Sequence, residues 1–357
     1  MDILSIVERI GEQPTAALFG LITGVLFGVA AQRSAFCLRA ATVEFARGAL
    51  GPRMSIWLLT FSTAMVWVQA AQLLGLMRAE DARMMAVPGT WSGAVIGGLI
   101  FGVGMVLARG CSGRLLVLAA TGNLRSVVSG LVFAVVAQMS LEGWLAPLRN
   151  RISGLWVTPG GRNVDLLAAT GLPAYGGLAL GLALAVLAIV LARRNALGLT
   201  RLFMASGVGF AVAVGWVLTF GLSQVAFDPV QIESATFTGP SAHTLMFFLV
   251  PDSVLEFDIG LVPGVFLGAF FAAFFTGELK LQGFDGPAVM QRSMIGAALM
   301  GFGGMLAGGC AIGAGVTGSS IFAATAWLAL TCMWIGAVAT DVLVDQKRGN
   351  RSAAATA

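Results

Sequence analysis

Residues 102–111 read GVGMVLARGC, and residues 301–310 read GFGGMLAGGC. The two stretches agree in register at six of their ten positions, including the final cysteine. Glycine and alanine are common throughout the chain, whereas cysteine occurs only four times, at 37, 111, 310 and 332. Because a rare residue falls at the same place in both copies, the pattern indicates an internal duplication.

The chain around these motifs has the composition of a membrane protein. It has 357 residues, of which 57% are hydrophobic and 11% charged, and its mean hydropathy is +0.89. Soluble domains carry about 25% charged residues. The net charge of +4 is small and scattered, which argues against nucleic acid as a partner. The lipid bilayer is the partner that this composition predicts.

A membrane-crossing helix needs about 20 mostly apolar residues. Nine stretches reach or approach this length: 16–36, 54–77, 91–109, 124–147, 174–192, 202–222, 259–276, 290–308 and 321–344. Four shorter, glycine-rich segments lie between them, at 37–48, 110–121, 241–250 and 310–320. Irregular or short segments persist at membrane depth only when protein or a cavity surrounds them. We therefore expect an all-α polytopic membrane protein with about nine transmembrane helices and short re-entrant half-helices.

The duplicated motif pairs the third span with the eighth, and a weaker echo near Gly24 and Gly207 pairs the first with the sixth. Five steps separate the members of each pair, and an odd step reverses the orientation across the membrane. Inverted repeats of this kind are typical of transporters. The expected organisation is one transmembrane transport domain over 1–357. It comprises a first half at 16–148, a connecting span at 174–192, an inverted second half at 202–344 and a cytoplasmic tail at 345–357.

Charge distribution predicts the orientation in the membrane. The connection 223–258 contains five acidic residues and neither Lys nor Arg, whereas 193–201 contains three arginines. By the positive-inside rule the first faces outward and the second faces the cytoplasm. The N-terminus is then outside and the C-terminus cytoplasmic. The arginines of the segment 149–162 disagree with this orientation.

Each copy of the motif places its cysteine where a long span ends and a short segment begins. The free N–H groups at the start of a half-helix favour anions, and arginines adjacent in sequence, Arg109 and Arg114 beside Cys111 and Arg33 and Arg39 beside Cys37, add positive potential. The alternative interpretation is packing. It is preferred for Cys332, is evenly balanced for Cys37, and is disfavoured for Cys111 and Cys310. The only histidine, His243, is expected to be structural or solvated.

Two other functional classes stay open from the residues alone. A membrane thiol redox or soft-metal carrier would use Cys111 and Cys310, since thiolates select soft metals, but such proteins usually show clustered ligands. An intramembrane enzyme would need a catalytic motif, and the chain contains neither HExxH nor GxSxG. We therefore expect a transporter, neither an enzyme nor a protein with a bound cofactor.

Several longer stretches resemble one known family. They are FGVAAQRSAFCLRAA (27–41), RGCSGRLLVLAATGNLRS (109–126), EGWLAPLR (142–149) and LQGFDGPAVMQRSMIGAALMGFGGMLAGGCAIGAGVTGSS (281–320). In order and spacing they are similar to the motifs of YeeE/YedE-type sulfur-transport proteins, and they cover most of both halves. One departure is Ala314, at a position where family members often place His or Gln.

The resemblance implies a bacterial inner-membrane importer of thiosulfate, or a related sulfur anion, with an hourglass-like pathway between two inverted halves. It implies a path lined by the thiols of Cys37, Cys111 and Cys310, which pass the anion along by weak S–H hydrogen bonds. The expected site also includes the flanking glycines and two anion-attracting arginines: Gly110, Gly113, Gly309, Gly313, Arg33 and Arg109. It further implies a small sulfur-carrier protein as a cytoplasmic partner.

Overall fold

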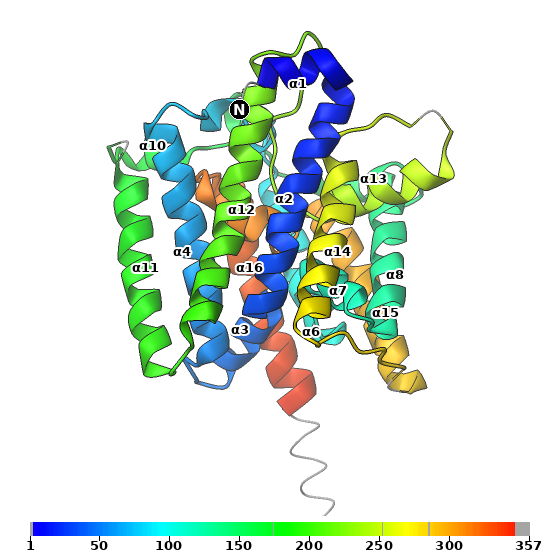
Figure 1. Ribbon diagram of the computed structural model, residues 1–357. Coiled ribbons are helices and arrows are strands. Elements are labelled where there is room, and N and C mark those ends of the chain that lie inside the picture. Colours follow the sequence, from blue (N-terminus) through cyan, green and yellow to red (C-terminus); the bar gives the residue numbers. More distant parts are fainter. Residues whose placement is uncertain (1–2, 174, 252, 285, 347–357) are drawn as a thin grey trace, which may run out of the picture.

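The computed structural model describes residues 3–346 except 174, 252 and 285 (Figure 1). Nine long helices are α2 (Glu12–Ser34), α4 (Pro52–Leu73), α6 (Trp91–Leu107), α8 (Leu124–Leu141), α11 (Gly176–Arg194), α12 (Leu199–Ser223), α14 (Phe257–Phe275), α15 (Pro287–Leu306) and α16 (Ala324–Thr340). Four short elements lie between them: α3 (Leu38–Ala46), α7 (Ser112–Ala120), α13 (Thr238–Leu249) and the π-helical turn η3 (Gly313–Gly318). The remaining elements are α1 (Ile3–Ile10), η1 (Ala79–Asp81), α5 (Arg83–Ala86), α9 (Ala146–Ser153), η2 (Pro159–Gly161), α10 (Leu166–Thr170) and η4 (Asp341–Gln346). Most of the predicted cytoplasmic tail, 345–357, lies outside the described residues, which end at 346.

The all-α polytopic fold predicted from the sequence is confirmed. Within the described residues, eight helical stretches are long and apolar enough to cross a membrane. They are Glu12–Ala46, Pro52–Leu73, Trp91–Ala120, Leu124–Leu141, Gly176–Arg194, Leu199–Ser223, Phe257–Phe275 and Ala324–Gln346. The ninth predicted span, 290–308, forms the 20-residue helix α15, whose first turns are more polar because they carry Gln291 and Arg292. Three short elements fall within segments predicted to hold half-helices, and α13 overlaps the fourth, 241–250, but begins earlier, at Thr238. A nine-residue helix such as α3 or α7 rises only about 14 Å and is too short to cross a bilayer.

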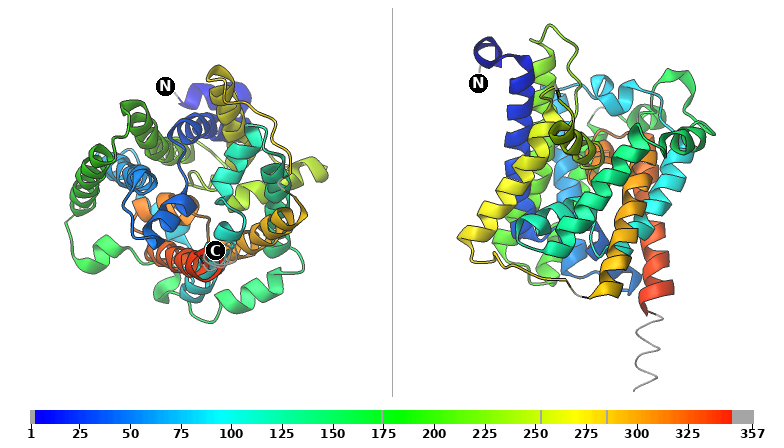
Figure 2. Two further views of the ribbon diagram at one scale, coloured as in Figure 1. Left: turned by 90° about the horizontal axis from the view of Figure 1, so that it is seen from below. Right: turned by 90° about the vertical axis from the view of Figure 1, so that its right-hand side faces the viewer.

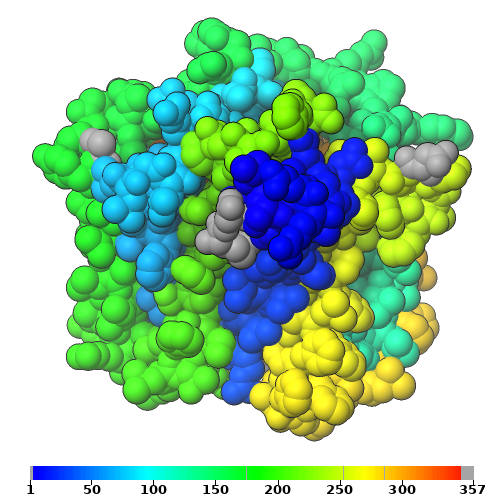
Figure 3. Space-filling view, turned by 45° about the horizontal axis from the view of Figure 1, so that its top comes forward, coloured from blue at the N-terminus to red at the C-terminus, as the bar shows by residue number. Residues whose placement is uncertain are grey.

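The two ends of the described chain lie at opposite ends of the molecule (Figure 1). Helix α1 lies across one end, here called the α1 end, and η4 leaves the other, called the η4 end. At the α1 end, the Glu12 carboxylate accepts hydrogen bonds from the backbone N–H groups of Phe227 and Asp228. Figure 3 shows α1 beside this segment on the surface. Long helices surround α3 and α7 when the molecule is seen along its length, whereas α13 extends outward to the periphery (Figure 2).

Close helix packing depends on rows of glycines spaced by four residues. In α2 these are Gly20, Gly24 and Gly28, and in α14 they are Gly260, Gly264 and Gly268. A Cβ atom added to any of these six glycines would overlap the backbone of the opposite helix. Small residues at such spacing let two helix backbones approach within a membrane. Helices α2 and α14 therefore pack closely along their length, and both contact the short helix α7.

Packing between the long helices follows a regular pattern. Helix α2 packs on α14, and α12 packs on α4. Helix α6 packs on α16, and α15 packs on α8. The central pairs are α2 with α12 and α6 with α15, while α11 lies outside this set against α4.

Candidate functional site: short helices capped by cysteines

Three cysteines follow the same backbone turn. Each lies two residues after a residue in the left-handed conformation that ends a long helix. These pairs are Ala35 (φ 53°) with Cys37, Arg109 (φ 58°) with Cys111, and Gly308 (φ 76°) with Cys310. The duplicated motif folds alike in both copies: the Gly110 N–H donates to Met105 O at 3.1 Å, and the Gly309 N–H donates to Gly304 O at 2.9 Å. The sequence repeat is thus a repeated helix-ending turn that delivers a cysteine.

Cys37 and Cys111 each begin a short helix, and Cys310 lies two residues before Ile312, the N-cap residue of η3. Cys37 is the N-cap residue of α3, and Cys111 is the N-cap residue of α7. Cys310 accepts a 2.8 Å hydrogen bond at its carbonyl from the N–H of Ala314 as η3 begins. The first N–H groups of a helix have no partner within it, and they carry the positive end of its dipole. The thiols are therefore held beside N–H groups that favour an anion.

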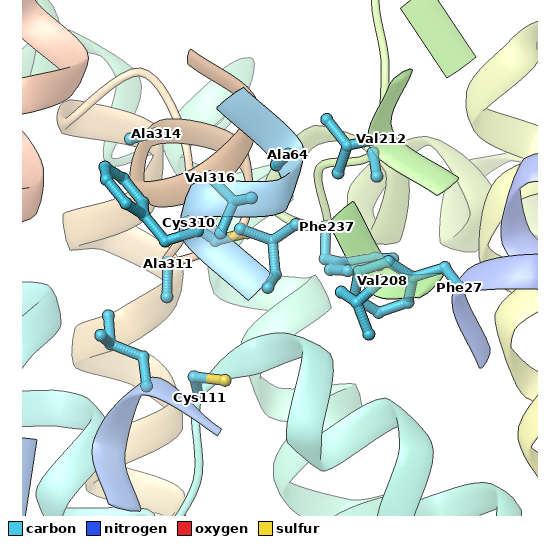
Figure 4. Close-up of a cluster of buried hydrophobic side chains, with 14 of the residues drawn as sticks. Phe27, Ala64, Cys111, Val208, Val212, Phe237, Cys310, Ala311, Ala314 and Val316 are labelled. Atoms are coloured by element: carbon cyan, nitrogen blue, oxygen red, sulfur yellow. The ribbon is translucent and has the colours of Figure 1, made fainter. Parts of the chain in front are cut away.

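The three cysteines converge in the core. The thiols of Cys37 and Cys111 lie close enough to act on each other electrostatically, and the thiol of Cys310 acts on Cys111 in the same way. All three residues are buried. Figure 4 shows Cys111 and Cys310 in one cluster of buried side chains with Phe237 and Phe27. The structure thus brings together residues that lie far apart in the sequence.

A fourth short element starts in the same region without a cysteine. Phe237 is the N-cap residue of α13, and its ring centroid lies 5.0 Å from that of Phe27. Phe237 was not among the predicted site residues because no cysteine marks this position in the sequence. A signal was present: Ser34-Ala35-Phe36-Cys37 and Ser234-Ala235-Thr236-Phe237 share their first two residues and both precede a short helix. The turn η3 reaches this segment through the Thr317 hydroxyl, which donates to Ala235 O at 2.5 Å.

A cavity of about 360 Å³ extends from the α1 end toward this region, and we call it the vestibule. Its lining includes three basic side chains, Arg83, Arg149 and His243, and it reaches Gly309, next to Cys310. Thr236 and Thr238 also line it. The Thr238 hydroxyl is buried and makes no hydrogen bond to a described residue. The vestibule therefore offers positive charge at its rim and a free hydroxyl close to a thiol.

On the other side of the thiols lies Arg114, in the first turn of α7. Its guanidinium interacts electrostatically with Cys37 and Cys111, and Arg53 and Glu278 also act on it. Its Nη1 atom is buried without a hydrogen-bond partner among the described residues, as is the hydroxyl of Ser112. Both groups have donor capacity that an anion could use.

The two arginines proposed as anion attractors lie further out. Arg109 is exposed, and Arg33 is half-buried in the last turn of α2. Arg109 has a second role that the sequence did not suggest, since its positive φ ends α6 where the other copy has Gly308. Arg114, by contrast, is placed close to the thiols of Cys37 and Cys111.

The flanking glycines differ in what surrounds them. A Cβ atom at Gly113 would lie 3.2 Å from the Phe237 ring and 3.5 Å from Ile312 Cγ1. At Gly313 it would overlap the Thr236 hydroxyl, and at Gly309 it would lie 2.8 Å from Ala314 N. At Gly110 it would meet only ordinary contacts, at 3.5 Å or more. Gly113 and Gly313 therefore allow the short elements to meet closely, whereas Gly309 allows its own turn to close.

The glycines inside the duplicated motif have a packing role. Added Cβ atoms at Gly102, Gly104, Gly301 and Gly303 would crowd the backbone of a neighbouring helix. Cys332 lies in α16, where its Cβ packs against Gly98 of α6. This fits the packing interpretation of Cys332.

Ala314 is buried in η3, and its carbonyl accepts a 3.1 Å hydrogen bond from the Ser319 hydroxyl.

Among the described residues, no group of three or more His, Cys, Asp or Glu side chains is arranged to hold a metal ion. The soft-metal alternative therefore gains no support from the geometry.

The helices and the buried thiol centre define a multi-pass membrane protein with a polar, thiol-bearing core. Residues 33–339 match the family described as Sulphur transport, and the chain belongs to this YeeE/YedE family. It is 27% identical to the thiosulfate transporter TsuA of Escherichia coli (strain K12) over 95% of this chain and 98% of that protein. It is 27% identical to the thiosulfate transporter TsuA of Spirochaeta thermophila (strain ATCC 700085 / DSM 6578 / Z-1203) over 87% of this chain and 93% of that protein.

Proposed function

We propose that this protein takes up thiosulfate, or a closely related sulfur anion, through a path lined by the thiols of Cys37, Cys111 and Cys310. The observation that carries the proposal is the convergence of these three thiols at the starts of short helical elements. Two relatives that match nearly the whole chain are named as thiosulfate transporters. Both observations point to the same solute and the same region.

The side chains along the proposed path offer a sequence of donors. The anion first meets the basic rim of the vestibule and the free hydroxyl of Thr238. It then passes the thiols and the hydroxyl of Ser112, and it leaves past Arg114 toward the η4 end. Helix N-termini at Cys37 and Cys111 add the positive ends of two dipoles.

Thiols suit the narrow part of such a path because transport needs binding that is loose enough to release. The S–H group is a weak donor, whereas arginine makes strong, bidentate hydrogen bonds to oxyanions. Thiosulfate carries two negative charges and a soft terminal sulfur. Placing most arginines at the mouths and thiols at the centre therefore favours passage over retention.

We infer that the domain is built from two inverted halves, 16–148 and 202–344, joined by the span 174–192. The packing pattern supports this. Exchanging each long helix for its counterpart turns the α2–α14 pair into α12–α4, and the α6–α16 pair into α15–α8. Exchanging the short elements likewise turns α3–α4 into α13–α14 and α7–α8 into η3–α16. A pathway between two such halves would be widest at the ends and narrowest near the thiols.

The same scheme gives an orientation in the bacterial inner membrane, with the α1 end outside and the η4 end in the cytoplasm. An odd number of crossings agrees with chain ends at opposite ends of the molecule (Figure 1). A fluorescent protein fused to the C-terminus should therefore fluoresce, and an alkaline phosphatase fused there should be inactive. The opposite pattern would reverse the proposed direction.

In the proposed orientation, a cytoplasmic sulfur-carrier protein would receive the anion at the η4 end.

The substrate is tested by growth of a bacterium that lacks its own sulfate and thiosulfate importers. Expression of this protein should restore growth on thiosulfate as sole sulfur source, and a strain with an empty vector should not grow. Immunoblotting of membranes should show that the protein is inserted. Failure to grow despite insertion, together with rescue on another sulfur compound, would assign a different solute.

A further inference from the structure

Four ionisable side chains at the α1 end form two linked pairs. Arg83 Nη2 lies 3.6 Å from Glu233 Oε2, and His243 Nδ1 lies 2.8 Å from Asp258 Oδ2. The two carboxylates are buried, whereas Arg83 and His243 are partly exposed, at 42% and 35% of their side chains. The transport path described above uses neither carboxylate.

The backbone that carries each carboxylate is fixed in position. The hydroxyl of Thr219 donates to Glu233 O at 2.7 Å and accepts from Glu233 N at 3.2 Å, and Asp258 lies in the first turn of α14. The negative charge of Asp258 acts on Glu233. The second oxygen of Asp258, Oδ1, is buried and has no hydrogen-bond partner among the described residues. Ionising both groups without further donors is costly, so the pair favours an added proton.

The cluster lies between two cavities. Arg83 and His243 line the vestibule. Glu233 lines a second cavity of about 190 Å³, together with the acidic residues Glu12, Asp228 and Glu256. A proton held by this cluster therefore changes the charge beside the vestibule, although neither carboxylate lines the vestibule itself.

We propose that Glu233, Asp258 and His243 form a proton-binding site that controls the anion affinity of the vestibule, so that protons are taken up when the transported anion binds. This rests on the proposed function, since it assumes that a sulfur anion occupies the vestibule. Binding linkage is reciprocal: if a bound proton strengthens anion binding, the bound anion must strengthen proton binding by the same factor.

The direction of the effect follows from the surroundings of each group. Burial, reinforced by the charge of Asp258, raises the pKa of Glu233 to about 8, although Arg83 opposes this and Glu256 adds to it. The hydrogen bond to Asp258 raises the pKa of His243 above its usual value, and burial and Arg83 act in the opposite direction. Near neutral pH, Glu233 is therefore mostly protonated. Above pH 8 the cluster loses protons, the vestibule loses positive charge, and anion binding weakens.

The test measures proton uptake directly. Sodium thiosulfate is titrated into the purified full-length protein by isothermal calorimetry at pH 6.5, 7.5 and 9, in buffers with different heats of protonation. We expect net proton uptake at pH 7.5 and an affinity about five- to tenfold weaker at pH 9 than at pH 6.5, as expected for added charge at short range near a protein surface.

Variants separate the site from its surroundings. Glu233→Gln keeps an uncharged, hydrogen-bonding side chain, and it should lose most of the proton uptake at pH 7.5 and flatten the affinity change above that pH. Asp228→Asn removes an exposed carboxylate from the same cavity that is not among the charges acting on Glu233 or His243, and it should behave like the parent. Thiosulfate binding without proton uptake in the parent, or unchanged uptake in Glu233→Gln, would overturn the inference. No thiosulfate binding at any pH would instead refute the proposed function.

Discussion

At the scale of the residue, two glycines beside one cysteine differ in what they allow. Gly113 faces the Phe237 ring and Ile312, which belong to two other short-element segments, whereas Gly110 faces only its own turn. The sequence marks both glycines equally, because each flanks Cys111. Only the packing of the short elements distinguishes them.

This difference leads to a prediction. Gly113→Ala should reduce thiosulfate uptake several-fold, because its Cβ atom would push the Phe237 ring and change the spacing at the thiol centre. Gly110→Ala is the matched control and should retain uptake close to that of the parent. Uptake of radiolabelled thiosulfate by cells with equal amounts of inserted protein measures both. Equal uptake by the two variants would show that the contact with Phe237 does not matter.

The candidate site was predictable from the sequence where a rare residue marked it. Cys111 and Cys310 stood out because cysteine is rare and the surrounding motif is repeated. Phe237 and the carboxylate pair did not stand out, since phenylalanine is abundant here and Glu233 and Asp258 lie in a segment that reads as an acidic loop. Their roles depend on contacts between segments distant in the sequence, which hydropathy and local motifs do not report.

At the scale of the element, apolar length alone predicted the long helices closely. The predicted span 16–36 became α2, and the predicted segment 110–121 became α7. Helix partners were harder to predict, because glycines at a spacing of four occur in several spans. The structure shows that α2 and α14 use theirs against each other.

The α2–α14 pair gives a stability prediction. Gly260→Ala would place a Cβ atom on the carbonyl oxygen of Ala17, so the helices would have to separate. Overpacking of this kind costs about 1–3 kcal/mol, and thermal unfolding in detergent should shift to lower temperature. Gly130→Ala, in α8, adds a methyl group with nothing within 4 Å and should not lower the unfolding temperature. A shift as large for Gly130→Ala as for Gly260→Ala would contradict the role of this helix pair.

At the scale of the whole molecule, the starts of the four short elements lie near one another in the interior, and long helices surround α3 and α7 (Figure 2). The vestibule approaches this meeting point from the α1 end, and Arg114 lies beyond the thiols. At the η4 end, Asp341 pairs with Arg47 at 3.2 Å and Asp345 pairs with Arg292 at 2.6 Å. The proposed path therefore runs from a basic vestibule, past three thiols, toward an end held by ion pairs.

The central claim is that Cys37, Cys111 and Cys310 line this path. It is tested most directly by uptake of radiolabelled thiosulfate into proteoliposomes that contain the purified protein or one of four variants, with each cysteine changed to Ala in turn. We predict that Cys37→Ala, Cys111→Ala and Cys310→Ala lose at least about tenfold in initial rate, which corresponds to about 1.4 kcal/mol in the barrier. Cys332→Ala, which removes a thiol packed on α6, should retain the parent rate. Parent-like uptake by all four variants would contradict the claim and reduce the three converging thiols to packing residues.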